Sequence, residues 1–202
     1  MAHRRIWDGP SFFSANSFKC CLLFGLKHLR KLALLIALAF VAYWGFQYWR
    51  EHRFDSIIAA AARHYGLDPA LVKAVVWQES RFHPSIRGRA GELGLMQIRE
   101  AAAMEWAASE HIRSFEHREC LNPATNVEAG AYYLKHIERH YTRADDPIPY
   151  MLAEYNAGRG NVVKWLAGAA ATNSGAFIQQ IGFPGTKAYV LAILDRRNRY
   201  ER

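Results

Sequence analysis

One glutamate occupies a position where an apolar side chain is expected. The inward stripe of a helix predicted over residues 69–81 consists of Leu71, Val72, Val75 and Val76. Glu79 follows Val76 by three residues and Val75 by four, so it continues this stripe. Burial and the C-terminal end of a helix both disfavour a negative charge and therefore raise the pKa of a carboxyl group. Such a group suits general acid catalysis near neutral pH, whereas a solvated helix-end glutamate is the alternative.

Three short motifs accompany Glu79 in a fixed order. They are QESRFHP at 78–84, GELGLMQI at 91–98 and AEYNAG at 153–158. Together they resemble the lytic transglycosylase family with the goose-type-lysozyme-like fold (the SLT domain), over roughly residues 55–195.

The resemblance implies an activity on the bacterial cell wall. Members of this family cleave the β-1,4 bond between N-acetylmuramic acid and N-acetylglucosamine in peptidoglycan and form a 1,6-anhydro-muramic end. It implies that Glu79 acts first as the acid and then as the base, with no cofactor, and that glycan strands are the partner. Two alternatives stay open, a hydrolytic muramidase that uses the same glutamate and a non-catalytic glycan-binding scaffold of a wall-spanning assembly. The residues identify no protein partner.

The resemblance also implies which side chains bind the substrate. Met96 and Gln97 are expected beside the glutamate, and Tyr155 and Asn156 on the opposite wall of the cleft. The hydroxyl of Tyr155 is expected to reach the carboxylate or the substrate, and Tyr189 to support the pocket from the last helix. For Met96 and Tyr155, ordinary core packing is the alternative.

Four further residues are expected to shape the site rather than to react. Ser80 lacks a motif-placed His and Asp partner, so a structural hydrogen bond is expected instead of a nucleophilic role. Gly91 and Gly94 are expected to permit tight turns and close approach of a sugar. Asn126 is expected to cap or pin a loop, with a contact to the sugar as the alternative.

Two positions depart from the family pattern. Gly88 stands where many members have a serine that reaches toward the substrate. Glu92 stands where relatives often have a small residue, and it is either a second acid or a solvated carboxylate paired with Arg87 or Arg89. We favour the solvated carboxylate.

No metal site is predicted. His136 and His140 have a helical i, i+4 spacing, but the sequence places no third ligand near them. Cys20, Cys21 and Cys120 are too few for a disulfide framework or a zinc cluster, and Cys120 is expected to be an inert thiol.

The elements that position these residues are predicted to be helices. Asp68-Pro69 and Asn122-Pro123 are typical helix starts, and no alternating strand pattern follows residue 50. The predicted helices are 54–65, 69–81, 98–110, 123–141, 147–157, 160–168, 175–181 and 186–199. The fold class is therefore all-α, a lysozyme-like helical domain preceded by one transmembrane helix.

The positive charge is concentrated at the N-terminus. Residues 1–31 carry six Lys or Arg and one Asp, whereas the other 171 residues carry 20 basic and 17 acidic groups. The formal net charge of +8 therefore does not indicate nucleic-acid binding.

An uncharged segment at 32–49 has 18 residues, at the short end of the length that spans a bilayer. We predict a basic cytoplasmic tail at 1–31, a single-pass anchor at 32–49 in the cytoplasmic membrane, and the lytic transglycosylase domain at 50–202. Basic residues before the segment place the N-terminus inside and the domain on the periplasmic or wall side. A buried core helix and a signal peptide cleaved near Ala37-Leu38-Ala39 are the alternatives.

Overall fold

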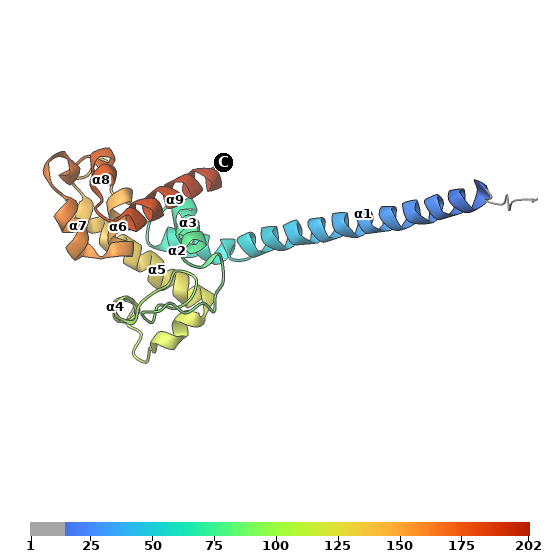
Figure 1. The fold of residues 1–202 in the computed structure, drawn as a ribbon. Helices are drawn as coiled ribbons and strands as arrows, with labels where there is room; N and C mark the ends of the chain where they lie inside the picture. The colour runs from blue at the N-terminus through green and yellow to red at the C-terminus, as the bar shows by residue number, and fades with distance from the viewer. Residues whose placement is uncertain (1–14) are drawn as a thin grey trace, which may run out of the picture. The chain divides into compact units, whose positions relative to one another are not determined.

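A computed structural model describes residues 15–202, with side chains from Leu29 onward. Its contacts divide the chain into two compact units, Met1–Trp49 and Arg50–Arg202. Every regular element of residues 15–202 is an α-helix or a 3-10 helix, which confirms the predicted all-α class (Figure 1). The only β-type pairing in that range is two isolated bridges, both made by Leu93.

The first helix, α1 (Ala15–His52), contains the predicted anchor. Its large apolar side chains are exposed, for example Leu35 at 63% and Val41 at 68%. In the described part of the chain, one segment (Leu29–His64) is long and apolar enough to cross a membrane, and its most apolar window is 0% buried. That exposure is contrary to the alternative of a buried core helix. Of the predicted tail, residues 1–14 lie outside the described residues, and residues 15–31 belong to α1.

The predicted helices are present, and their ends differ from the predicted ones by at most three residues. The α-helices after α1 are α2 (Asp55–His64), α3 (Pro69–Ser80), α4 (Glu100–Ser109), α5 (Pro123–Glu138), α6 (Ile148–Ala157), α7 (Arg159–Trp165), α8 (Ser174–Gln180) and α9 (Pro184–Tyr200). The short 3-10 helices are η1 (His117–Leu121), η2 (Arg139–Tyr141) and η3 (Gly168–Ala171). The predicted helix 123–141 therefore ends in a separate 3-10 turn. Helix η1 lies outside every predicted helix.

Helix α3 is the central helix of the second unit. The Asp68 side chain accepts a hydrogen bond from the Ala70 amide at 2.9 Å, and Pro69 occupies the first helical position, so both start signals act as predicted. All residues from Leu71 to Val76 are buried. A helix that is buried around its whole circumference must be covered by neighbours, and α2 and α9 pack against it (Figure 1). Helix α9 packs in turn on α6, and α5 packs on α2, α4 and α6.

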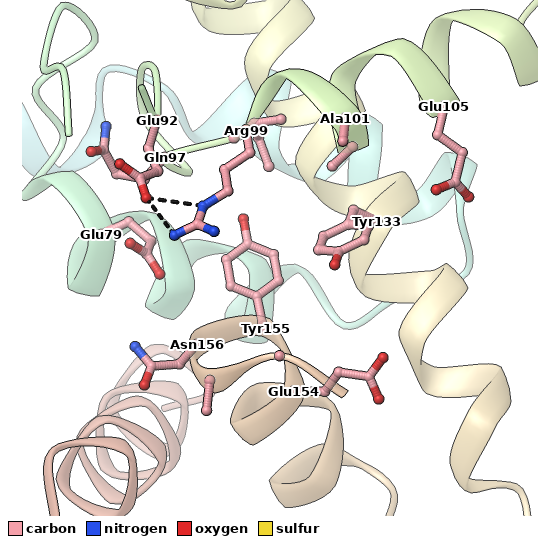
Figure 2. Close-up of a pocket in the computed structure, with 14 residues that line it drawn as sticks. Glu79, Glu92, Gln97, Arg99, Ala101, Glu105, Tyr133, Glu154, Tyr155 and Asn156 are labelled. Carbon is pink, nitrogen blue, oxygen red and sulfur yellow. Dashed lines mark hydrogen bonds and ion pairs between the residues drawn. The ribbon is translucent and has the colours of Figure 1, made fainter. Parts of the chain in front are cut away.

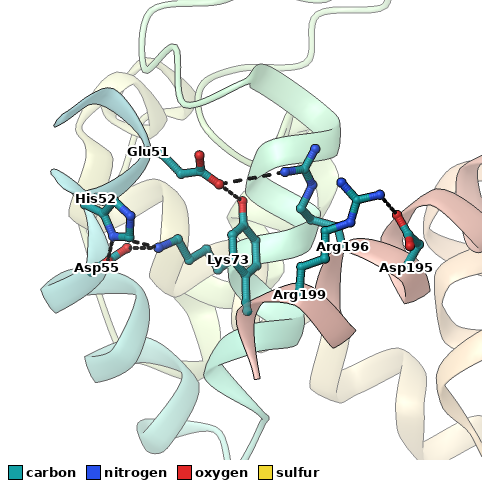
Figure 3. Close-up of polar contacts among 8 residues, drawn as sticks. Glu51, His52, Asp55, Lys73, Asp195, Arg196 and Arg199 are labelled. Atoms are coloured by element: carbon teal, nitrogen blue, oxygen red, sulfur yellow. Dashed lines mark hydrogen bonds and ion pairs between the residues drawn. The ribbon is translucent and has the colours of Figure 1, made fainter. Parts of the chain in front are cut away.

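Polar contacts tie the beginning of the second unit to its last helix (Figure 3). The Tyr200 hydroxyl donates to Glu51 at 2.6 Å, and Arg196 lies 3.9 Å from the same carboxylate. Lys73 of α3 forms an ion pair with Asp55 of α2 at 2.7 Å. These contacts connect the C-terminal end of α1 to α9, and α2 to α3.

The long loop between α3 and α4 is fixed by one buried side chain. Asn126 of α5 is 0% exposed and accepts a hydrogen bond from the Met96 amide at 2.7 Å. Its amide group donates to the carbonyls of Leu93 at 2.7 Å and Cys120 at 2.8 Å. Buried polar groups need such partners, so Asn126 determines where this loop lies. The prediction that Asn126 pins a loop is confirmed.

Gly94 is predicted to tolerate no side chain. Its φ is +75°, and a Cβ atom there would lie 2.4 Å from the Asn126 amide nitrogen and 2.4 Å from the Cys120 carbonyl oxygen. Gly94→Ala should lower the free energy of unfolding by at least about 2 kcal/mol beyond the cost of backbone strain, measured by urea denaturation in detergent. Gly91→Ala is the matched control because Gly91 has φ +85° and open space around it, so strain alone applies, about 1–2 kcal/mol. Equal losses in the two variants would contradict the packing argument.

Candidate active site

Glu79 lies in the last turn of α3 and faces a cleft of about 500 Å³. Ligand-binding clefts commonly have this size. The cleft is lined by Glu79, Glu92, Gln97, Ile98, Arg99, Ala101, Ala102, Glu105, Tyr133, Glu154, Tyr155, Asn156, Ala157 and Gly158. Figure 2 shows Gln97 and Glu92 on the same side of the cleft as Glu79, with Tyr155 and Asn156 on the other side. The structure therefore brings together residues from all three sequence motifs.

Tyr189 of α9 holds the carboxyl group of Glu79. Its hydroxyl donates a hydrogen bond to Glu79 Oε1 at 2.5 Å, and the tyrosine side chain is buried. This contact is possible because α3 and α9 pack side by side. Burial and the nearby carboxylate of Glu79 raise the pKa of Tyr189 well above its ordinary value, so the phenol remains a donor over the physiological pH range.

Burial raises the pKa of Glu79 from 4.5 to about 7. The hydrogen bond from Tyr189 opposes this shift because it favours the ionised form. The negative charge of Glu92 supports the shift. Desolvation is the largest of these effects, so near neutral pH Glu79 is present in both protonated and ionised forms.

Tyr155 has a different partner from the one expected. Its hydroxyl donates to the Met96 carbonyl at 2.7 Å rather than to Glu79, which Tyr189 contacts instead. Tyr189 supports the pocket from the last helix as expected, and it also makes the contact with the carboxyl group that was expected of Tyr155. Tyr155 still lines the cleft with its ring.

Met96 lies in the core rather than on the wall of the cleft. It is 0% exposed, and a Cβ atom on Gly130 would lie 2.3 Å from its sulfur. The structure therefore favours the core-packing alternative for its side chain. Only its backbone has a direct relation to the cleft, through the hydrogen bond from Tyr155.

Gln97 and Asn156 both line the cleft. Gln97 has φ +49°, and its side-chain amide donates to the Gly94 carbonyl at 2.8 Å. Asn156 is exposed, and its side-chain oxygen accepts a hydrogen bond from the Thr186 hydroxyl at 2.8 Å. Each side chain is therefore oriented by a protein partner and retains polar atoms that can contact a ligand.

The expected supporting residues lie next to the site. The Ser80 hydroxyl is buried and donates to the Val76 carbonyl at 3.1 Å, one helical turn back. Gly91 and Gly94 both have positive φ values, in the loop that carries Glu92 and Gln97. Ordinary residues adopt such backbone conformations at a cost.

Glu92 is not the solvated partner of Arg87 or Arg89 that the sequence analysis favoured. Its carboxylate lines the cleft and accepts two hydrogen bonds from Arg99, at 2.8 and 3.0 Å. Hydrogen bonds from backbone amides, with a contribution from Arg99, lower the pKa of Glu92 below its usual range. A carboxyl group with a lowered pKa is ionised near neutral pH, so Glu92 does not serve as a second acid.

Several cleft residues were missed by the sequence analysis. Arg99, Tyr133 and Glu105 line the cleft but lie outside the motifs. Glu154 also lines it, and its position directly before Tyr155 in the third motif was the available signal.

The two histidines with helical spacing bind carboxylates instead of a common ion. His136 lies 2.9 Å from Glu105, and His140 lies 3.1 Å from Glu154. Among the residues whose side chains are described, no group of three or more His, Cys, Asp or Glu is arranged to hold a metal ion.

Cys120 is buried, and burial raises the pKa of its thiol to about 12, which leaves it unreactive near neutral pH.

The geometry defines an acid–base site within a lysozyme-like helical domain. Glu79 lines the cleft with a pKa raised to about 7. The model of the SLT transglycosylase domain family matches residues 56–178, and the chain belongs to this family. The matched range contains Glu79 and all three motifs.

Similar sequences carry related names. The chain is 33% identical over 118 residues to membrane-bound lytic murein transglycosylase F of Desulfosudis oleivorans, covering 57% of this chain and 24% of that protein. It is 32% identical over 123 residues to the soluble lytic murein transglycosylase of Escherichia coli, covering 60% of this chain and 19% of that protein. The chain thus spans about a fifth to a quarter of these relatives.

Solved structures show the same fold. The 70 kDa soluble lytic transglycosylase of Escherichia coli superposes with a TM-score of 0.66 at 26% identity, covering 73% of this chain and 24% of that chain. An inactive variant of lytic transglycosylase Slt from Pseudomonas aeruginosa gives a TM-score of 0.65 at 27% identity, covering 72% and 23%. These likenesses confirm the predicted family and fold.

The raised pKa of Glu79 predicts a pH-dependent cost in stability. A neutral Glu79 stabilises the folded state fully below pH 4.5, and this stability is lost as the pH rises through about 7. Glu79→Gln cannot ionise, so its free energy of unfolding should not show this loss. Relative to the wild type, the free energy of unfolding of Glu79→Gln should therefore rise by up to about 3 kcal/mol between pH 4.5 and 8. Urea denaturation of both proteins across this range measures the difference. A difference that does not change with pH would contradict the raised pKa.

Proposed function

We propose that the protein is a lytic transglycosylase that cleaves the β-1,4 bond between N-acetylmuramic acid and N-acetylglucosamine in peptidoglycan. The observation that carries the proposal is the partial burial of Glu79 in the cleft, with a pKa of about 7. Membership of the SLT transglycosylase domain family supports it, as do the names of the similar proteins.

In the first step Glu79 acts as the general acid. The protonated carboxyl group donates its proton to the glycosidic oxygen as the bond to the muramic sugar breaks. The N-acetyl group of that sugar stabilises the cationic centre that forms. A group whose pKa lies near the working pH is well suited to this transfer, because a substantial fraction is protonated and the proton still leaves readily.

In the second step the same residue acts as the base. Glu79, now a carboxylate, takes the proton from the C6 hydroxyl, whose oxygen closes the 1,6-anhydro ring. The hydroxyl of Tyr189 stabilises this carboxylate between the two transfers, because it donates to Oε1 at 2.5 Å. Gln97 and Asn156 are proposed to contact the sugars, and Tyr155 to provide an aromatic wall.

The reaction predicts a specific product and a specific dependence on Glu79. Digestion of purified peptidoglycan should give muramic ends that are lighter by one water than reducing ends, as measured by mass spectrometry. Glu79→Gln should lose at least about 100-fold in rate, because the amide cannot donate or accept the catalytic proton.

Glu100→Gln is the matched control, since Glu100 is an exposed glutamate in the first turn of α4 and does not line the cleft. It should keep the rate of the wild type. Predominantly reducing ends would instead identify a hydrolytic muramidase that uses the same cleft. Glycan binding without cleavage by the native chain would identify a scaffold.

We also propose that residues 32–49 anchor the enzyme in the cytoplasmic membrane. The exposed apolar side chains of α1 and its length support this assignment. Lys27, Arg30 and Lys31 precede the segment, so the N-terminus is placed in the cytoplasm and residues 50–202 on the periplasmic or wall side.

The proposed topology predicts where a reporter fused to the C-terminus works. A reporter that is active only outside the cytoplasm should be active in this fusion, and the fusion should remain with the membrane pellet. Replacing Lys27, Arg30 and Lys31 by glutamine should reduce that activity, because the charge difference across the segment is removed. Activity of a strictly cytoplasmic reporter at the C-terminus would contradict the topology.

A further inference from the structure

Besides Glu79, the cleft contains a charged pair on the loop between α3 and α4. Glu92 and Arg99 both line the cleft, and two hydrogen bonds of 2.8 and 3.0 Å join them (Figure 2). The carboxylate of Glu92 also accepts the backbone amide of Ala90 at 2.9 Å. Glu92 is therefore held in place by two independent partners, one of which does not depend on Arg99.

The backbone leaves room for this carboxylate at Gly88. A Cβ atom on residue 88 would lie 2.3 Å from Glu92 Oε2 and 2.9 Å from Glu92 Cβ. The same atom would lie 2.9 Å from the side-chain oxygen of Gln97. Glycine at position 88 thus allows Glu92 to occupy the space next to Gln97.

The titratable side chains that line the cleft or contact Glu79 come from several elements. They are Tyr189 of α9, Tyr155 and Glu154 of α6, Tyr133 of α5, Glu105 of α4, and Glu92 and Arg99 of the loop. Tyr189 and Tyr155 stay neutral because burial raises the pKa of each phenol well above its ordinary value. Glu154 and Glu105 are each paired with a histidine.

Glu92 is the carboxylate whose negative charge acts on Glu79, and two partners hold it in place. The pKa of Glu92 is lowered by its hydrogen bonds, so the group stays ionised while Glu79 titrates. Its negative charge disfavours the ionised form of Glu79. Arg99 partly offsets that charge from the more exposed side, since its side chain is 68% exposed and that of Glu92 is 18% exposed.

We infer that Glu92 and Arg99 are positioning residues for the acid–base function of Glu79, and that together they set the pH range over which Glu79 carries its catalytic proton. This inference rests on the proposed function. Glu92 supplies a fixed negative charge next to the proton donor, and Arg99 determines how strongly that charge acts on Glu79.

The inference predicts opposite effects of two substitutions. Glu92→Gln keeps the shape but removes the negative charge, so the high-pH limb of kcat/KM should move to lower pH by about one unit. Arg99→Gln leaves Glu92 held by Ala90 and removes the offsetting positive charge, so the same limb should move to higher pH. If Glu92 and Arg99 only stabilised the loop, the two substitutions would not move the high-pH limb of kcat/KM in opposite directions. The measurement is the rate of release of soluble muropeptides from peptidoglycan by the full chain between pH 4.5 and 9.

Asp195→Asn and Arg199→Gln are the matched controls. These residues form an exposed carboxylate–guanidinium pair on α9 that does not line the cleft. Neither control should move the limb. Gly88→Ala adds a separate check of the geometry. Its Cβ should displace the Glu92 carboxylate and so move the high-pH limb of kcat/KM to lower pH. When Glu92→Ala is already present, Gly88→Ala should move the limb no further.

The possible outcomes distinguish the inference from the proposed function. An active wild type and an inactive Glu79→Gln variant, with limbs that stay unmoved in both Glu92→Gln and Arg99→Gln, would overturn the inference and leave the function intact. A changed ratio of anhydro to reducing ends in Glu92→Gln with an unmoved limb would also overturn it, because Glu92 would then act on water. An inactive wild type would contradict the proposed function itself.

Discussion

The site depends on a carboxyl group that is held away from water at the end of a buried helix. Glu79 continues the apolar stripe of α3, so the packing that stabilises the core also places this side chain in the cleft. Removing water raises the proton affinity of the group, and the hydroxyl of Tyr189 limits that rise. The opposing effects leave a pKa of about 7, which lets one residue both give and receive a proton. In the proposed function, the contact between α3 and α9 is therefore needed for the acid–base role of Glu79 as well as for packing.

The loop between α3 and α4 is irregular, so helical hydrogen bonds do not fix its position. Its position depends on Asn126, whose buried side chain makes three hydrogen bonds to the backbones of Met96, Leu93 and Cys120. Networks of this kind are rigid when every group is satisfied. This rigidity explains how residues with positive φ, such as Gln97, can be kept in a less favourable backbone conformation beside the cleft.

Much of the fold follows from local signals, whereas part of the site does not. The helix starts at Asp68-Pro69 and Asn122-Pro123 are determined by capping and proline geometry, which a sequence displays directly. The inward position of Glu79 follows from helical periodicity. The partners of Tyr155 and Glu92 could not be predicted in this way, because they depend on the path of an irregular loop that is fixed by hydrogen bonds over long sequence separations. The motifs indicated Glu79, Gln97, Tyr155 and Asn156 at the cleft, whereas the structure was needed to place Met96 in the core and to add Arg99, Tyr133 and Glu105.

The proton affinity of Glu79 can be measured directly by carbon-13 NMR. The full-length protein, labelled at the glutamate carboxyl carbons and held in detergent micelles, is titrated with acid, and the spectrum of Glu79→Gln identifies the resonance. A midpoint at about pH 7, well above the ordinary value of 4.5, is expected. A midpoint at the ordinary value would contradict it, because the carboxyl group would then be solvated and unable to hold its proton near neutral pH.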